Sequence, residues 1–457
     1  MAPLLSRLRG DGLVARVMRS SAFTALGYGA SQAMRLASNL ILTRLLFPEA
    51  FGMMALVSVF IVGLTMFSDV GVGPSILQHR RGDDRDFLNT AWTVQVIRGG
   101  ILWIMTMALA LPVAHFYDQP QLALLLPVAG ISLLIHGFEP TRIETAARHL
   151  QLGRVTALDL VAQAIGIVAM VIMAWLLQSV WALVVGWIIS AIARLVLMSR
   201  YLPGEGNRLR WEPEAARDLI HFGVWLFLST ACGFLVAQGD KAILGKYLTL
   251  EHLGLYNIGF FLASFPLLLG QTVTGRILIP LYRERPPGAS AENFRAIRRM
   301  RFGMTACIMA LVAVMAFLGE GIVALMYDDR YAAAGAILVL IAVIQIPQVI
   351  GMTYDQSALA AGDSRNYFYF TLARATFLTL GMILGAESMG LVGALVGQGL
   401  AAIASYPVLI WLARRHGAWD GLHDVFFAVV GVGLAVLALA VNQTALRALI
   451  ALFGVGP

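Results

Sequence analysis

The chain alternates long apolar segments with short polar connectors over most of its length. A bilayer core takes roughly 20 apolar residues as a helix. The pattern therefore predicts membrane-spanning helices at residues 21–43, 51–77, 88–112, 121–140, 155–177, 180–200, 217–240, 253–281, 300–319, 333–359, 366–386, 389–412 and 424–441. A further apolar tail, 446–455, is short for a span. We expect an all-α polytopic membrane protein with twelve core transmembrane helices and one or two more at the C-terminus.

Basic residues gather in every second connector. Examples of such connectors are those with Arg80, Arg81 and Arg85, with Arg142, Arg148 and Arg154, and with Arg283, Arg285, Arg295, Arg298, Arg299 and Arg301. The intervening connectors hold few basic residues, mainly Arg44, Lys246 and Arg330. Positive charge favours the cytoplasmic side of a membrane. The alternation therefore predicts a multi-pass protein of the bacterial inner membrane with its N-terminus in the cytoplasm.

The chain contains an internal repeat. The segment ILTRLLFPEAFGMM, which starts at Ile41, aligns without a gap with ILGKYLTLEHLGLY, which starts at Ile243. Gly52 and Gly254 are among the identical positions. Both copies begin on the same predicted side of the membrane, which is typical of a parallel repeat.

The repeat predicts two six-helix lobes around a central cavity. We place the lobes at residues 21–200 and 217–412, joined by a polar cytoplasmic linker at 201–216 that has two prolines and two glycines. A cytoplasmic segment at 1–20 precedes them. An extra transmembrane segment with a tail, 413–457, follows them.

Composition agrees with a membrane protein. Apolar residues make up 59% and charged residues 13% of the chain, whereas soluble domains carry about 25% charged residues. The net charge of +7 is explained by the cytoplasmic connectors, so nucleic acid is not an expected partner. The two cysteines have no metal or disulfide spacing, and no nucleotide-binding, protease or hydrolase motif is present. We therefore expect no enzyme, no catalytic residue, no metal and no cofactor.

Charged and polar residues inside the predicted spans are the candidates for substrate binding. A charge at the bilayer centre costs about 2.5–3.5 kcal/mol on insertion scales, and such residues usually face a cavity. A guanidinium is a good phosphate ligand because its planar fork binds two oxygens and stays charged. The candidates for phosphate are Arg35, Arg98 and Arg374, and those for a glycan include Asn257, Gln271 and Tyr354. Hydrogen bonds between helices are the alternative role of the polar residues.

Three further charges are candidates for ion coupling or for a counter-ion role. Asp69 lies in the second span and can serve as a counter-ion to an embedded arginine or as a protonatable group. Asp240 and Lys241 lie at the outer end of the seventh span, where an interfacial ion pair is an equal alternative.

Several segments carry a resemblance to a known family. These are Asp240–Tyr247 with the following Leu253-Gly254-Leu255-Tyr256-Asn257, Leu45–Gly52, Phe67–Gly71 and Arg148–Arg154. Over residues 20–412 the chain resembles Wzx-type polysaccharide transporters, and among them the colanic-acid-transporter branch. These belong to the multidrug/oligosaccharidyl-lipid/polysaccharide exporter superfamily.

The resemblance implies a two-lobed fold and a flippase activity. The substrate would be an oligosaccharide linked to undecaprenyl diphosphate, moved from the cytoplasmic to the periplasmic leaflet. Arg35, Arg98 and Arg374 would line a cationic cavity, and residues 44–50 and 246–253 would close the outer gate. The expected partners are the lipid-linked oligosaccharide, membrane lipids, and a polysaccharide polymerase with a chain-length regulator.

Rival functions remain open at this point. A cation-coupled multidrug antiporter of the same superfamily would use an acidic cavity residue, whereas the embedded arginines favour an anionic substrate. A lipid II flippase is a second alternative. A membrane glycan polymerase or ligase would need a large polar outer loop, and all the outer connectors are short. The sequence sets neither the glycan, nor the coupling ion, nor the oligomeric state.

Overall fold

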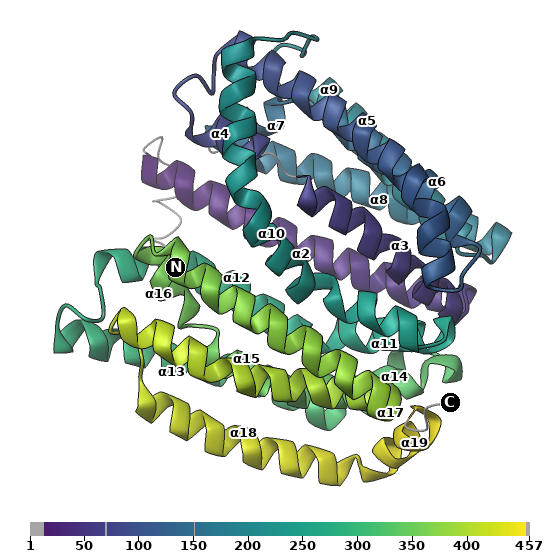
Figure 1. The fold of residues 1–457 in the computed structure, drawn as a ribbon, viewed down its shortest axis with the longest axis vertical. Coiled ribbons are helices and arrows are strands. Elements are labelled where there is room, and N and C mark those ends of the chain that lie inside the picture. The colour runs from purple at the N-terminus through teal and green to yellow at the C-terminus, as the bar shows by residue number, and fades with distance from the viewer. Residues whose placement is uncertain (1–12, 69–70, 150, 454–457) are drawn as a thin grey trace. The chain divides into compact units, whose positions relative to one another are not determined.

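The computed structural model describes residues 13–68, 71–149 and 151–453, except the side chains of residues 13–25, 218, 220–229 and 276 (Figure 1). All regular elements in these ranges are helices. Seven of the described helices are long and apolar enough to cross a membrane, or up to ten if each bent pair counts as one span. The all-α polytopic class is confirmed, and the count of twelve core helices stays a prediction.

The elements follow the predicted spans closely. The first part of the chain contains α2 (Leu13–Leu45), α3 (Pro48–Phe67), α4 (Val72–Gln78), α5 (Arg85–Phe116), α6 (Leu122–Gly137), α7 (Arg142–Arg148), α8 (Leu152–Leu177), α9 (Trp181–Tyr201) and α10 (Pro213–Tyr247). The second part contains α11 (Leu250–Ala263), α12 (Phe265–Glu284), α13 (Ala291–Met326), the 3-10 turn η1 (Asp329–Tyr331), α14 (Ala333–Ile344), α15 (Ile346–Gly351), α16 (Asp355–Ala360), α17 (Ser364–Arg415), α18 (Gly421–Val441) and α19 (Gln443–Phe453).

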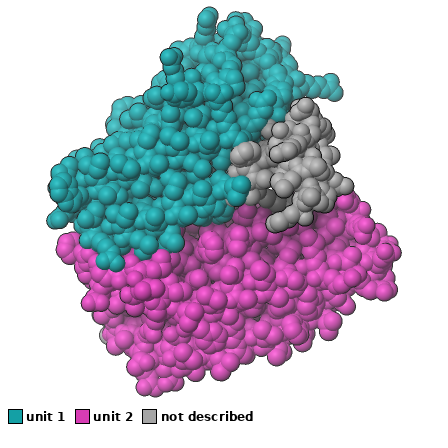
Figure 2. Space-filling view, turned by 180° about the vertical axis from the view of Figure 1, so that it is seen from behind, with its two compact units in different colours: residues 1–46, 56–231 teal, residues 47–55, 232–457 magenta. Residues whose placement is uncertain are grey.

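The chain folds into two compact units (Figure 2). Unit 1 comprises residues 1–46 and 56–231, and unit 2 comprises 47–55 and 232–457. Within unit 1, α8 packs on α9 and on α2, and α5 packs on α6. Within unit 2, α14 packs on α13 and α11, and α12 packs on α16.

Several spans that the sequence predicts as continuous are bent or broken. The predicted span 333–359 consists of α14, α15 and α16, and its two halves bend by 40° at Gln345. Pro347 stands in the first turn of α15, where its missing N–H and fixed φ favour the start of a new helix. The predicted span 121–140 ends at Gly137 and bends by 57° into α7.

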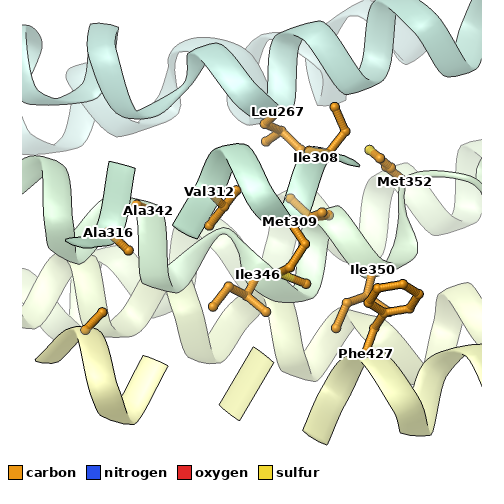
Figure 3. Close-up of a cluster of buried hydrophobic side chains, with 12 residues drawn as sticks. Leu267, Ile308, Met309, Val312, Ala316, Ala342, Ile346, Ile350, Met352 and Phe427 are labelled. Carbon is orange, nitrogen blue, oxygen red and sulfur yellow. The ribbon is translucent and has the colours of Figure 1, made fainter. Parts of the chain in front are cut away.

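One hydrophobic cluster of unit 2 is built from one face of α13 and the elements that pack against it (Figure 3). It consists of Leu267, Ile308, Met309, Val312, Ala316, Ala342, Ile346, Val349, Ile350, Met352, Phe427 and Ala438. Phe427 and Ala438 come from α18. Lipid tails are as apolar as leucine, so van der Waals packing contributes most to such contacts in a membrane. The helix beyond the twelve-helix plan is therefore an integral part of unit 2.

α17 is a hairpin of two helical arms. Residues 364–388 form the first arm and 391–415 the second, with non-helical backbone at Met389 and at Gly390, whose φ is +57°. Gly381 faces Gly397 and Gly385 faces Gly393 so closely that a Cβ on any of them would overlap the opposite carbonyl group. This close approach of the backbones is what small residues provide between membrane helices.

The two glycines shared by the sequence repeat lie against each other in unit 2. A Cβ on Gly52 would overlap the carbonyl oxygen of Leu250, and one on Gly254 would overlap that of Pro48. The first turn of α3 therefore crosses the first turn of α11 with backbone against backbone. The contact is reciprocal, because each glycine lies against the carbonyl group four residues before the other glycine.

The connector before α10 is held to unit 1 by hydrogen bonds. Three alternate backbone N–H groups donate to side-chain oxygens near the start of α5: Arg208 to Asn89 Oδ1 at 3.0 Å, Arg210 to Thr93 Oγ1 at 2.9 Å, and Glu212 to Thr90 Oγ1 at 3.2 Å. The spacing of two is that of an extended chain with one side on a surface. We call residues 207–212 the linker strap.

The guanidinium of Arg81, in the connector between α4 and α5, binds the C-terminal end of the linker strap. Arg81 donates to Glu212 at 2.7 Å and to Asp84 at 2.6 Å. These hydrogen bonds hold the pKa of both carboxyls below their usual values. Their contribution to stability is therefore complete at neutral pH. It is lost as the pH falls below about 4, the usual carboxyl range, through the lowered values.

We expect Arg81→Ala to loosen the linker strap. Trypsin should then cut after Arg208 and Arg210 several-fold faster than in the wild-type protein, because the ionic contacts that hold Glu212 are lost. The exposed neighbour Arg80 supplies the control variant Arg80→Ala. Limited digestion of the purified protein in detergent checks this, and equal cleavage of all three proteins would contradict it. In the wild-type protein, hydrogen exchange of the strap should accelerate below about pH 4, beyond the change in intrinsic rate.

Candidate functional site

Unit 2 contains a polar cavity of about 300 Å³. Its walls come from α12, α15, α16 and both arms of α17. The lining residues are Gln271, Pro347, Gln348, Gly351, Met352, Asp355, Gln356, Tyr367, Phe370, Arg374, Ala402, Ser405, Tyr406 and Leu409. We call it the Arg374 cavity.

The broken helices of unit 2 place polar side chains at this cavity. α15 ends at Gly351 and α16 begins at Asp355, so Gln348 and Asp355 reach the cavity from two short helices. Arg374 lies ten residues into the first arm of α17, which is about 15 Å along the helix. An unbroken helix over 333–359 would present a narrower set of side chains on one face.

Arg374 is the cationic group of the cavity. It is half-buried and donates to Gln348 Oε1 at 3.2 Å. A guanidinium has five N–H donors, and within the described residues one of them is hydrogen-bonded to protein. The carboxylate of Asp355 lines the same cavity and is an electrostatic partner of this guanidinium. The cavity therefore combines a guanidinium that has several N–H donors, a carboxylate that can act as its counter-ion, and the side-chain amides of three glutamines.

Tyr354 lies next to the cavity but not in its lining. Its side chain is fully buried, and its hydroxyl donates to Asp424 Oδ1 at 2.6 Å. Its ring covers the guanidinium of Arg301, at 4.2 Å from the ring centroid. Asp355, the next residue, reaches the cavity instead. The position of Tyr354 favours a supporting role over direct contact with a substrate.

Arg301 belongs to the interior of unit 2, although the sequence groups it with the connector arginines. α13 begins ten residues earlier, at Ala291, and Arg301 is only 1% exposed. It donates to the hydroxyl of Tyr282 at 2.9 Å. Arg301 therefore lies within a long helix and in the interior of unit 2, and not in an exposed connector, because α13 begins well before the predicted span at residue 300.

The start of α18 is fixed to α13 by polar contacts. Asp420 accepts two hydrogen bonds from Arg298, at 2.5 and 2.9 Å. His423 lies 3.0 Å from Thr305 Oγ1, and Asp424 accepts from the indole of Trp419 at 3.0 Å. We call Asp420, His423 and Asp424 the α18 anchor. Burial acts to raise the pKa of Asp420, but the hydrogen bonds from Arg298 outweigh it and hold that pKa below its usual value.

The predicted residues of unit 1 lie on two helices. Arg35 is exposed on α2, on the same helical face as Tyr28, Gln32 and Asn39, since these positions recur at a spacing of three or four. Gln32 donates to the hydroxyl of Tyr28 at 2.9 Å. This face is polar, as a substrate-facing surface requires.

Arg98 connects two helices of unit 1. It is half-buried on α5 and donates to Ser68 Oγ at 3.0 Å and to the carbonyl oxygen of Thr65 at 2.9 Å. It thus binds the C-terminal end of α3, where carbonyl groups lack helical partners. Asp69, the predicted counter-ion, lies outside the described residues.

Three other predicted residues lie on α10 and α11. Asp240 is buried and accepts from the hydroxyl of Tyr256 at 2.6 Å. The ammonium of Lys241 lies 5.7 Å from the ring centroid of Phe260, and Asn257 is half-buried. The described lining of the Arg374 cavity includes none of these three. Of the predicted set, the cavity brings together Arg374 and Gln271, and the roles of all of them stay predictions.

Sequence reasoning missed part of the cavity. Asp355 stands at a predicted helix end, where pairing in the cytoplasm is the plainer expectation. Gln348 directly follows Pro347, and a proline in a predicted span signals a helix break. Pro347 is therefore the feature of the sequence that indicates a helix break here, and a helix break allows nearby polar side chains to face a cavity.

The all-helical fold with its long apolar helices defines a multi-pass membrane protein, and unit 2 of this protein contains a polar cavity. Residues 41–334, well over half of the chain, match the family described as polysaccharide biosynthesis protein. The chain therefore belongs to that family, in agreement with the resemblance that the sequence shows.

Two curated relatives have names from bacterial polysaccharide synthesis. The teichuronic acid biosynthesis protein TuaB of Bacillus subtilis is 19% identical over 75% of this chain and 71% of its own length. The succinoglycan biosynthesis transport protein ExoT of Rhizobium meliloti is 22% identical over 85% of this chain and 78% of its own.

Solved structures share the fold at low sequence identity. An inward-facing multidrug resistance MATE transporter of the MOP superfamily superposes with a TM-score of 0.63 at 12% identity, covering 85% of this chain and 95% of its own. The lipid II flippase MurJ, in an inward closed conformation, gives 0.60 at 12% identity, covering 94% and 98%. The chain therefore shares the fold of these two structures.

Proposed function

We propose that the protein is a flippase for oligosaccharide repeat units linked to undecaprenyl diphosphate, and that it is not an enzyme. It moves them by alternating access from the cytoplasmic to the periplasmic leaflet for exopolysaccharide, capsule or O-antigen synthesis. The observation that carries the proposal is the Arg374 cavity, where a guanidinium and three amides meet inside a membrane protein of the polysaccharide biosynthesis family. The protein would lie in the inner membrane with its N-terminus in the cytoplasm.

The chemistry of the cavity suits a glycan diphosphate. The fork of Arg374 can bind two phosphate oxygens at once, and its charge persists at any physiological pH. Gln271, Gln348 and Gln356 can pair with sugar hydroxyls. In the empty cavity, Asp355 offsets part of the cost of an embedded cation, which is about 2.5–3.5 kcal/mol. An arriving diphosphate takes over that role.

Alternating access would involve the two lobes expected from the repeat, residues 21–200 and 217–412. We propose that they rock relative to each other, with 44–50 and 246–253 as the outer gate. The backbone crossing of Gly52 and Gly254 lies beside these segments. A contact without interlocking side chains can separate and reform at little cost in packing, as a gate requires.

The remaining predicted residues complete the proposal. Arg35 would present a second cation to the substrate from the polar face of α2, and Arg98 a third. Asp69, Asp240 and Lys241 would take part in ion coupling or act as counter-ions. A polysaccharide polymerase and a chain-length regulator would act on the product in the outer leaflet.

Deletion of the gene in the native host tests the function. We expect complete lipid-linked repeat units to accumulate on the cytoplasmic leaflet and the surface polysaccharide to be lost. Mass spectrometry of undecaprenyl-diphosphate-linked glycans, combined with a leaflet-accessibility assay, measures both. A plasmid copy of the wild-type gene, the control, should restore export.

Normal glycan lipids in both leaflets of the deletion strain would contradict the proposal. A drug-sensitive phenotype with intact polysaccharide would favour the multidrug antiporter, which cation-efflux assays would then examine.

A further inference from the structure

A second, apolar cavity lies along the α17 hairpin. It measures about 420 Å³, and both arms of α17 line it. The lining residues are Phe377, Leu380, Gly381, Leu384, Gly385, Ser388, Met389, Gly393, Val396, Gly397, Leu400, Ala401 and Ala404. We call it the α17 groove.

The groove exists because small residues line the contact between the two arms. The paired glycines at 381 and 397, and at 385 and 393, bring the backbones together and fill no space beside them. Leu380 and Leu384 stand on one arm, and Leu400 stands on the other, with more than half of each side chain exposed. The result is a shallow channel between two rows of apolar side chains.

The α17 groove continues the wall of the Arg374 cavity. On the first arm, the lining positions of the cavity and then of the groove follow one another at a spacing of three or four: Tyr367, Phe370 and Arg374, then Phe377, Gly381, Leu384 and Ser388. Such a spacing keeps all of them on one face of a helix. The stripe covers 22 residues, about 30 Å, which is the thickness of a bilayer core.

On the second arm the two sites instead meet at the same level, on different faces of the helix. Ala401 and Ala404 line the groove, whereas their neighbours Ala402 and Ser405 line the cavity. The polar cavity lies toward the end of the hairpin with Arg365, Arg414 and Arg415, which the positive-inside rule places in the cytoplasm. The groove lies toward the outer end.

We propose that the α17 groove holds the polyprenyl chain of the lipid-linked substrate while the Arg374 cavity holds its phosphates. The inference rests on the proposed function. A ligand that joins a diphosphate to a long hydrocarbon matches a helix face that is cationic at one end and apolar along the rest. With phosphates on the cytoplasmic side, the chain would extend toward the bilayer centre, which is its direction in the inner leaflet.

The covalent link explains why this occupant is preferred to a bulk lipid. Lipid tails are as apolar as the groove, so a free acyl chain gains little by leaving the bilayer for it. A polyprenyl chain that is tethered to bound phosphates is already held beside the groove at a high effective concentration. It therefore adds to the affinity even though the transfer from lipid to groove itself gains little. The groove would therefore select long-chain over short-chain diphosphates.

The test uses the purified full-length protein in nanodiscs and two probes, undecaprenyl diphosphate and geranyl diphosphate. Ala404→Trp and Val396→Trp fill the groove from its lining. Ile403→Trp, at the exposed, non-lining position beside Ala404, is the matched control. The dissociation constants of both probes are measured for all four proteins, and a thermal melt of each shows that it is folded.

We expect the wild-type protein and Ile403→Trp to bind undecaprenyl diphosphate at least about tenfold more tightly than geranyl diphosphate. The two groove variants should lose that preference and retain geranyl diphosphate binding. Unchanged binding of undecaprenyl diphosphate by both folded groove variants would overturn the proposal that the groove holds the polyprenyl chain, and would leave the proposed function standing. Equal competition by phosphatidylglycerol would also overturn it and identify an ordinary lipid site. Failure of the wild-type protein to bind either diphosphate would overturn the proposed function as well.

Discussion

Arg374→Ala is expected to lower the export of lipid-linked repeat units about 10- to 100-fold while leaving the fold intact. Hydrogen bonds to a charged group contribute about 1.5–3 kcal/mol each, and every 1.4 kcal/mol is a factor of about ten in binding. The arginine has one protein hydrogen bond in the described structure, to Gln348, so its removal costs little in packing. Its removal also leaves the carboxyl group of Asp355 in the cavity without its cationic partner.

Complementation of the deletion strain measures this effect through the amount of surface polysaccharide. Arg374→Lys keeps the charge but loses the planar fork, so we expect partial export. Arg365→Ala is the matched control, because Arg365 is an exposed arginine at the start of the same helix and lies outside the cavity lining. Full export by a folded, membrane-inserted Arg374→Ala protein would contradict the assignment of the cavity as the phosphate site.

Asp420→Ala is expected to destabilise unit 2 by about 3 kcal/mol. Breaking a buried ion pair costs about 3–5 kcal/mol, and the low end applies because the side chain of Arg298 is about one-third exposed while that of Asp420 is buried. The variant also loses the hydrogen bond from the backbone N–H of His423 to Asp420, at 3.3 Å. Both losses release the start of α18 from α13.

Thermal unfolding in detergent checks this, with an expected fall of several degrees in the midpoint. Glu292→Ala, which removes an exposed acid from α13, should melt as the wild-type protein does. Because the pKa of Asp420 is lowered, the wild-type midpoint should hold from neutral pH to about 4 and then fall as this carboxyl protonates. Equal midpoints for Asp420→Ala and the wild-type protein would show that the α18 anchor does not stabilise the fold.

The positions of the helices could be predicted from the sequence, because in a membrane the apolar segment itself is the helix. The predicted spans 155–177 and 180–200 differ from α8 and α9 by at most three residues at each end. Breaks within a span could not be predicted in this way. A hydropathy average over 333–359 hides the change of direction at Gln345, since the residues on both sides of it are apolar.

The candidate site was only partly predictable for a related reason. Arg374 and Gln271 stand out as polar residues in apolar surroundings, and both line the cavity. Arg301 does not stand out, because it lies among other arginines in sequence, and only the path of α13 shows that it is buried. The linker strap could not be predicted either. Its hydrogen bonds run from backbone N–H groups to Asn89, Thr90 and Thr93, and every residue except proline has such a backbone donor, so the sequence does not distinguish the ones that are used.

The crossing of Gly52 and Gly254 has an evolutionary consequence. After a duplication, the two copies of a segment are normally free to diverge, because each adapts to its own surroundings. Here the copies are each other's surroundings, since each glycine lies against the backbone of the opposite copy. No substitution in one copy can be compensated by a smaller residue in the other, where glycine already stands. Selection would therefore preserve both positions as a pair, long after the rest of the two segments has lost its common origin.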